Sequence, residues 1–103
     1  MNTELRKEYF DKAFKLHSTG NIEEAQILYN KIIEENPDDS EVLNLLGMIK
    51  MQVGDFVAAE SFIKKAISIQ KAQYFFETLA HLYFLQKLYE KELEVLEKIF
   101  IKK

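Results

Sequence analysis

The sequence has 103 residues, of which 48% are hydrophobic, but it contains only 3 glycines and 1 proline. This length fits one small domain, and the shortage of turn-forming residues excludes sandwiches and barrels. The net charge of −3 comes without a dense basic patch, so we expect no nucleic-acid partner. Cysteine is absent, which excludes disulfides and thiolate metal sites.

The N-terminus and the apolar runs give no sign of a membrane protein. Residues 1–8 are charged and lack the apolar centre of a signal peptide. No run of about 18 apolar residues occurs, so we expect no membrane-spanning segment. A cytoplasmic protein is the simplest interpretation, although a processed or shortened chain would show the same pattern.

Hydrophobic residues recur every three to four positions along the chain, which predicts an all-α fold. The predicted helices cover approximately residues 3–19, 22–35, 40–53, 56–70, 73–86 and 89–101. Gly20 and Gly54 are expected to end the first and third helices in the left-handed conformation. Asn21 and Asp55 are expected to cap the helices that follow, with Glu24 completing a capping box at Asn21.

The pattern repeats along the chain. Gly20 and Gly54 are 34 residues apart (54 − 20), and Ala25 and Ala59 keep the same offset. From the second unit to the third the offset shrinks to 33 (89 − 56). Each unit is a striped helix, a short turn and a second striped helix. We therefore divide one domain, residues 1–103, into units at approximately 6–39, 40–72 and 73–103.

These units resemble the tetratricopeptide repeat, a helix–turn–helix motif with a period of 34 residues. The matching positions are Tyr9, Ala13, Leu16, Gly20, Ala25, Tyr29 and Pro37 in unit one, Leu43, Leu46, Gly47, Gly54, Ala59, Ile63 and Ala66 in unit two, and Phe76, Leu79, Ala80, Tyr83, Tyr89 and Leu96 in unit three. The resemblance covers roughly residues 6–101. It implies a right-handed superhelical stack of three helix–turn–helix repeats, in which Gly47 lets the two helices of its unit approach closely.

The resemblance also implies a concave groove lined by the first helix of every unit. The residues that we expect to contact a partner there are Phe10, Phe14, His17, Asn44, Met48, Met51, Tyr74, His81 and Phe84. A polar rim is expected from Lys7, Asp11, Glu41 and Glu77, and further wall from Leu45, Gln52, Thr78 and Leu85. Aromatic and methionine side chains favour an apolar or amphipathic protein segment as partner. The alternative is that Phe14, Met48 and Phe84 are core residues.

Some members of this family hold a C-terminal carboxylate with Lys, Arg and Asn at fixed places. Those places here hold Phe10, Phe14, Leu45, Tyr74 and Thr78, so this clamp is absent.

The last predicted helix carries a second apolar surface. Tyr89, Leu93, Leu96 and Phe100 follow one another at intervals of four, three and four, which makes a continuous seam. An apolar surface on a terminal repeat is typical of an interface. We therefore expect self-association as a homo-oligomer through this helix, or contact with a further segment of a parent protein.

Residue patterns of catalysis are missing from the sequence. It has no phosphate-binding glycine loop, paired zinc ligands or nucleophile elbow. His17 and His81 lie on different units and have no evident further ligands. We expect no catalytic residue, no metal site and no cofactor. The expected function is a protein-interaction module, as an adaptor, a chaperone or the N-terminal domain of a larger protein such as a glycosyltransferase. A structural oligomerisation element is the alternative.

Overall fold

The structure is a computed structural model and describes residues 1–100. Within them it has six α-helices and no strand. The helices are α1 (Thr3–Ser18), α2 (Ile22–Glu35), α3 (Ser40–Gln52), α4 (Phe56–Ile69), α5 (Gln73–Leu85) and α6 (Tyr89–Phe100). The predicted helix boundaries agree to within one residue, although residue 101, the predicted end of the last helix, lies outside the described part of the chain.

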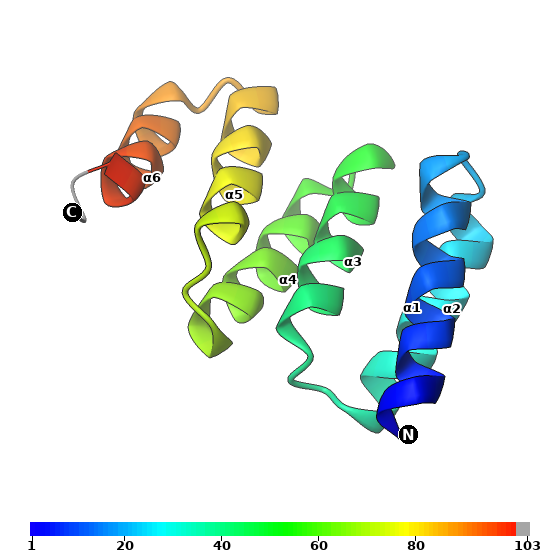
Figure 1. The fold of residues 1–103 in the computed structure, drawn as a ribbon. Helices are drawn as coiled ribbons and strands as arrows, with labels where there is room; N and C mark the ends of the chain where they lie inside the picture. Colours follow the sequence, from blue (N-terminus) through cyan, green and yellow to red (C-terminus); the bar gives the residue numbers. More distant parts are fainter. Residues whose placement is uncertain (101–103) are drawn as a thin grey trace.

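The helices form three consecutive pairs that stack side by side (Figure 1). α1 packs on α2, α3 on α4 and α5 on α6, while contacts of α2 with α3 and of α4 with α5 join the pairs. α1, α3 and α5 lie on the face toward the viewer in Figure 1, with α2 and α4 behind them. The predicted fold, an all-α right-handed superhelical stack, is confirmed.

The turn within each pair places one residue in the left-handed conformation. Gly20 has φ 88° and Gly54 has φ 83°, as their positions predict. In the third pair Lys87 takes this role with φ 60°, where a side chain is disfavoured. The third turn therefore keeps the geometry of the other two without their glycine.

The helix N-termini are capped differently from one another. Asp55 accepts a hydrogen bond from the backbone N–H of Ala58 at 3.2 Å, as predicted. The prediction for α2 is wrong, because Asn21 makes no capping hydrogen bond. Its side-chain amide instead donates to Thr19 Oγ1, in the preceding turn, at 3.1 Å.

The core is densest around the central helix. α3 buries nine of its 13 residues, whereas α1 buries only Ala13. Gly47 lies at the crossing of α3 with α4, where a Cβ would come 2.6 Å from Ile63 Cγ1 and 3.2 Å from the carbonyl oxygen of Ala59. The close approach predicted at Gly47 is thus confirmed, and it positions α3 between its neighbours.

No helix in residues 1–100 combines the length and the apolar character that a membrane crossing requires.

Candidate functional site

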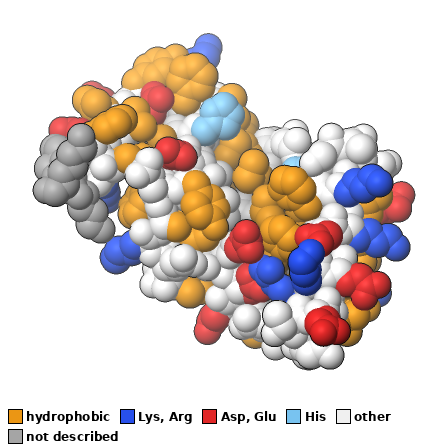
Figure 2. All heavy atoms as spheres, in the orientation of Figure 1, with side chains coloured by type: hydrophobic (Ala, Val, Ile, Leu, Met, Phe, Trp, Pro, Cys, Tyr) orange, Lys and Arg blue, Asp and Glu red, His pale blue; other side chains and the backbone are white. Residues whose placement is uncertain are grey.

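A groove with a volume of about 770 Å³ runs across the face formed by α1, α3 and α5. Its lining residues are Phe10, Phe14, Glu41, Asn44, Leu45, Met48, Met51, Gln52, Tyr74, Glu77, Thr78 and His81. Each of the three helix pairs contributes, because the first helix of every pair faces the same side of the stack. Figure 2 shows hydrophobic side chains gathered on this face, with acidic and basic side chains next to them.

Seven of the nine predicted contact residues line the groove. Phe14 is 50% exposed, Met48 37% and Tyr74 46%, so these side chains are surface rather than core. Met51 and Asn44 are buried and form the floor.

The other two predicted residues lie beside the groove. His17 lines a smaller adjoining recess with Phe14 and Met48. Phe84 lies outside both, exposed on the last turn of α5, and stacks against His81 with ring centroids 6.3 Å apart.

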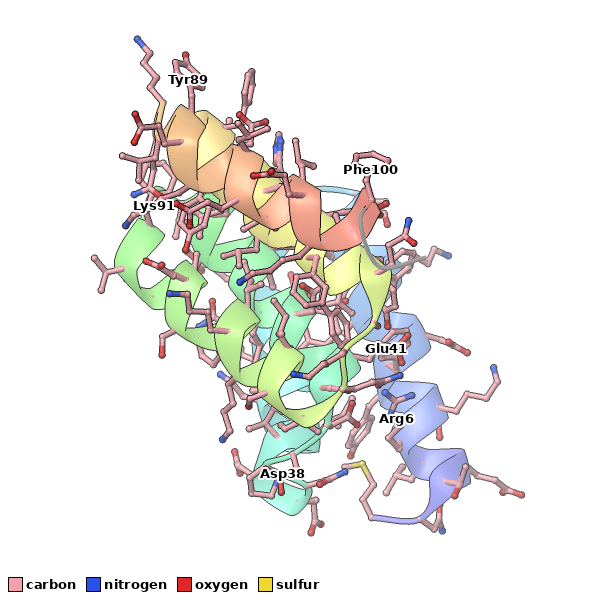
Figure 3. The ribbon with its side chains drawn as sticks, turned by 90° about the vertical axis from the view of Figure 1, so that its left-hand side faces the viewer. Arg6, Asp38, Glu41, Tyr89, Lys91 and Phe100 are labelled. Carbon is pink, nitrogen blue, oxygen red and sulfur yellow. The ribbon has the colours of Figure 1, made fainter. Side chains whose placement is uncertain are left out.

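At one end of the groove, Arg6 contacts residues of two helix pairs. It was not among the residues singled out from the sequence. Its Nε donates to Asp39 Oδ2 at 3.1 Å, and its Nη2 donates to Glu41 Oε1 at 3.0 Å. Its guanidinium also lies 4.7 Å from the ring centroid of Phe10. Figure 3 shows Arg6 beside Glu41. These contacts connect the first helix pair to the start of α3.

At the opposite end of the groove, a second pair of side chains connects α1 with α3. His17 Nε2 lies 2.6 Å from Gln52 Oε1, a hydrogen bond between the last turns of α1 and α3. Two predicted rim residues, Lys7 and Asp11, do not line the groove. They form an exposed ion pair with each other at 2.6 Å.

Two polar atoms beneath the groove have no hydrogen-bond partner. Asn44 is 3% exposed, and its Oδ1 is fully buried and unpaired. Its Nδ2 has only a long contact of 4.0 Å with Met48 Sδ. The hydroxyl of Tyr29 is likewise buried and unpaired. Burial, helped by the carboxylate of Glu41, raises the pKa of Tyr29 to about 12.

The acidic end of the groove influences a second tyrosine. Burial raises the pKa of the Tyr74 hydroxyl, and the carboxylates of Glu41 and Asp39 raise it further. Glu41 therefore raises the pKa values of tyrosines in both the first and the third helix pair.

The predicted seam on α6 is divided by the packing. Tyr89, Leu93 and Phe100 are 57%, 59% and 66% exposed, and Figure 3 shows Tyr89 and Phe100 projecting from the same side of the helix. Leu96 points elsewhere, because it packs against the buried cluster that contains Tyr83 and Val95. The exposed apolar face of α6 thus consists of Tyr89, Leu93 and Phe100.

In the part of the chain that the structure describes, no group of three His, Cys, Asp or Glu side chains is placed to hold a metal ion.

Comparisons with known proteins place these observations in a family context. Two family models described as tetratricopeptide repeat match residues 16–39 and 28–61. The second match spans 34 positions (61 − 28 + 1), the period found in the sequence. A search of curated proteins found no match.

Two solved structures share the fold. A mutant O-GlcNAc transferase of Thermobaculum terrenum superposes with a TM-score of 0.83 at 16% identity, over 99% of this chain and 21% of the transferase. The first tetratricopeptide repeat domain of Spaghetti (RPAP3), bound to the HSP90 peptide SRMEEVD, superposes with a TM-score of 0.80 at 20% identity. That match covers 100% of this chain and 87% of the other. The chain therefore spans about a fifth of the transferase and most of the Spaghetti domain.

Proposed function

We propose that this chain, which contains tetratricopeptide repeats, binds an apolar or amphipathic segment of another protein in the groove. We assign the repeats to approximately residues 6–39, 40–72 and 73–103. We propose that the chain acts as an adaptor, as a chaperone or as the N-terminal domain of a longer protein.

The observation that carries this proposal is the exposure of large apolar side chains inside a concave surface. Phe14, Met48 and Tyr74 come from three different helices, and all three line the groove while remaining exposed to water. Covering such a surface is favourable by roughly 25 cal/mol per Å² of apolar area. Methionine adapts its shape to varied apolar ligands, which favours loose sequence demands on the partner.

The character of the groove argues against capture of a C-terminal carboxylate. The places at which family members hold that group carry Phe10, Phe14, Leu45, Tyr74 and Thr78 here, none of which is a cation. The Spaghetti domain is bound to a peptide with three acidic residues. We propose a different class of ligand for this chain, one recognised mainly through apolar area.

The methionines of the chain allow a direct test of where a segment binds. The chain has three methionines, of which Met48 and Met51 line the groove and Met1 does not. We would select binding peptides from a random displayed library and add one to the chain labelled with ¹³C at the methionine methyl groups. We expect the signals of Met48 and Met51 to shift while that of Met1 stays unchanged. Tight binding without a shift at Met48 and Met51 would contradict the proposal.

Self-association is the second candidate function, and the exposed apolar face of α6 favours it. Tyr89, Leu93 and Phe100 are all more than half exposed on one terminal helix. A charge at Leu93 would have to be buried in a dimer that uses this face, at a large cost in desolvation. We expect sedimentation to show a concentration-dependent dimer that Leu93→Glu abolishes and that Val57→Glu, on α4, leaves intact. A monomer at every concentration would rule this candidate out.

A further inference from the structure

We propose that the segment bound in the groove carries a lysine or arginine among its apolar residues, that this cation lies between Glu41 and Glu77, and that Asn44 Oδ1 accepts a hydrogen bond from the same ligand. The inference rests on the proposed function and names the chemical class of its partner.

The charges of the groove have one sign. Its lining includes two carboxylates, those of Glu41 and Glu77, and no lysine or arginine. Glu41 comes from α3 and Glu77 from α5, so the two carboxylates approach a bound segment from neighbouring helices. A cation on an otherwise apolar segment would complement both, whereas an acidic segment would be repelled.

The cation nearest to this end does not cancel the negative charge. Arg6 is bound to Asp39 and Glu41 at about 3 Å. Glu77 accepts a hydrogen bond only from the neutral side chain of Gln73, at 3.2 Å. Together Arg6, Asp39, Glu41 and Glu77 therefore carry a net charge of −2 (+1 − 3). Burial raises the pKa of Tyr74, and the carboxylates of Glu41 and Asp39 raise it further, which is consistent with a negative potential here.

The floor of the groove supplies a second, independent indication of a ligand that donates hydrogen bonds. Asn44 lines the groove and is 97% buried, yet its Oδ1 has no partner. A buried acceptor without a donor destabilises the free chain, so a ligand that donates a hydrogen bond to it removes this cost. Met48 Sδ lies 4.0 Å from Asn44 Nδ2, and its flexible side chain, which also lines the groove, can change position when a segment enters. A backbone N–H or a lysine ammonium would then reach Oδ1.

The test starts from short peptides of random sequence, displayed and selected on the immobilised chain. Peptides whose binding is lost in Phe14→Ala count as groove ligands. We expect lysine and arginine to be enriched over aspartate and glutamate among them. The acidic peptide SRMEEVD serves as the contrasting probe, and we expect it to bind more weakly than the selected peptides.

Charge is then separated from apolar area by one substitution in the best peptide. Replacing its cationic residue by norleucine keeps an apolar chain and removes the charge. We expect this to weaken binding to the parent chain by about fivefold, the size of a partly screened ion pair. The loss should shrink in high salt. It should disappear in Glu41→Gln/Glu77→Gln and persist in the control Glu23→Gln/Glu34→Gln, which changes the net charge equally at exposed positions outside the groove.

Asn44 is tested separately, because its role need not involve charge. Asn44→Leu removes the unpaired acceptor, so we expect an equal or higher melting temperature together with binding weakened by about fivefold. If the leucine does not fit, Asn44→Ala provides the same comparison.

The outcomes distinguish this inference from the proposed function. Groove ligands without basic enrichment, or equal binding of the norleucine peptide, would overturn the cation while leaving the apolar groove in place. Unchanged binding to a folded Asn44→Leu chain would overturn the role of Asn44. A library without any peptide that depends on Phe14 would overturn the proposed function and this inference together.

Discussion

Residue 47 is a glycine, and its lack of a side chain allows the close approach of α3 and α4. A Cβ here would meet Ile63 Cγ1 at 2.6 Å and the carbonyl oxygen of Ala59 at 3.2 Å, and the backbone atom cannot rotate away. The glycine is therefore required by packing rather than by backbone conformation, unlike Gly20 and Gly54.

Replacing Gly47 by a larger residue should separate the two helices. We expect Gly47→Leu to lower the free energy of unfolding by about 1–3 kcal/mol, the usual cost of overpacking. Gly47→Ala should also destabilise, and adding Ile63→Ala should cost less than the sum of the two single changes, because it removes the clashing atom. Urea unfolding measures these values. Additive losses would show that Ile63 does not limit the approach.

A partly buried hydrogen bond links the second helix pair to the third. Tyr83 Oη on α5 donates to Glu60 Oε2 on α4 at 2.6 Å, and Lys64 forms an ion pair with the same oxygen at 3.0 Å. The hydrogen bond from Tyr83 first, and then that from Lys64, lower the pKa of Glu60 below its ordinary value of 4.5.

This link predicts a pH-dependent contribution to stability. A carboxyl with a lowered pKa stabilises the fold above its ordinary pKa, and this stability is lost as the pH falls through the folded value. We expect Tyr83→Phe to cost about 1 kcal/mol at neutral pH. The gap between the parent and Tyr83→Phe should narrow as the pH falls below 4.5. Denaturation at several pH values tests this, and a constant gap would contradict it.

At the scale of the helix, the N-termini of α2 and α4 offer a matched comparison. They follow the same glycine turn, but Asp55 caps its helix and Asn21 does not. We expect Asp55→Ala to lower the free energy of unfolding by about 1 kcal/mol, and Asn21→Ala to lower it clearly less. Thermal unfolding of the two variants decides the matter. Equal losses would mean that the Asn21 side chain caps α2 in solution.

Most helix boundaries could be predicted because their signals are local. The apolar stripes and the glycine turns each depend on a few neighbouring residues, so the sequence alone places them. Capping by Asn21 could not be decided in this way, because its side-chain amide donates to Thr19 while its oxygen accepts no hydrogen bond from α2. The third turn has no glycine, and the 33-residue offset from Phe56 to Tyr89 indicated its place.

At the scale of the whole molecule, the groove could be predicted because the repeat pattern indicates which helices line the concave side of the stack. Seven predicted residues line it, whereas Phe84 sits one turn too far along α5. Arg6 contacts Asp39 and Glu41, which lie 33 and 35 positions further along the chain, so no local sequence pattern predicts these contacts. The unpaired Oδ1 of Asn44 depends on packing from several helices, so it too required the structure.

The central claim is that the groove is the binding surface, and truncating its exposed side chains tests it most directly. The probe is a peptide selected on the chain, and its dissociation constant is measured for Phe14→Ala and Met48→Ala. Ile27→Ala and Val57→Ala are the controls, since both residues are exposed on the second helices of their pairs. We expect each groove variant, shown to be folded by circular dichroism, to lose about 1–3 kcal/mol of binding free energy while the controls lose almost none. Groove variants that bind as tightly as the parent would contradict the account and make the exposed face of α6 the better candidate.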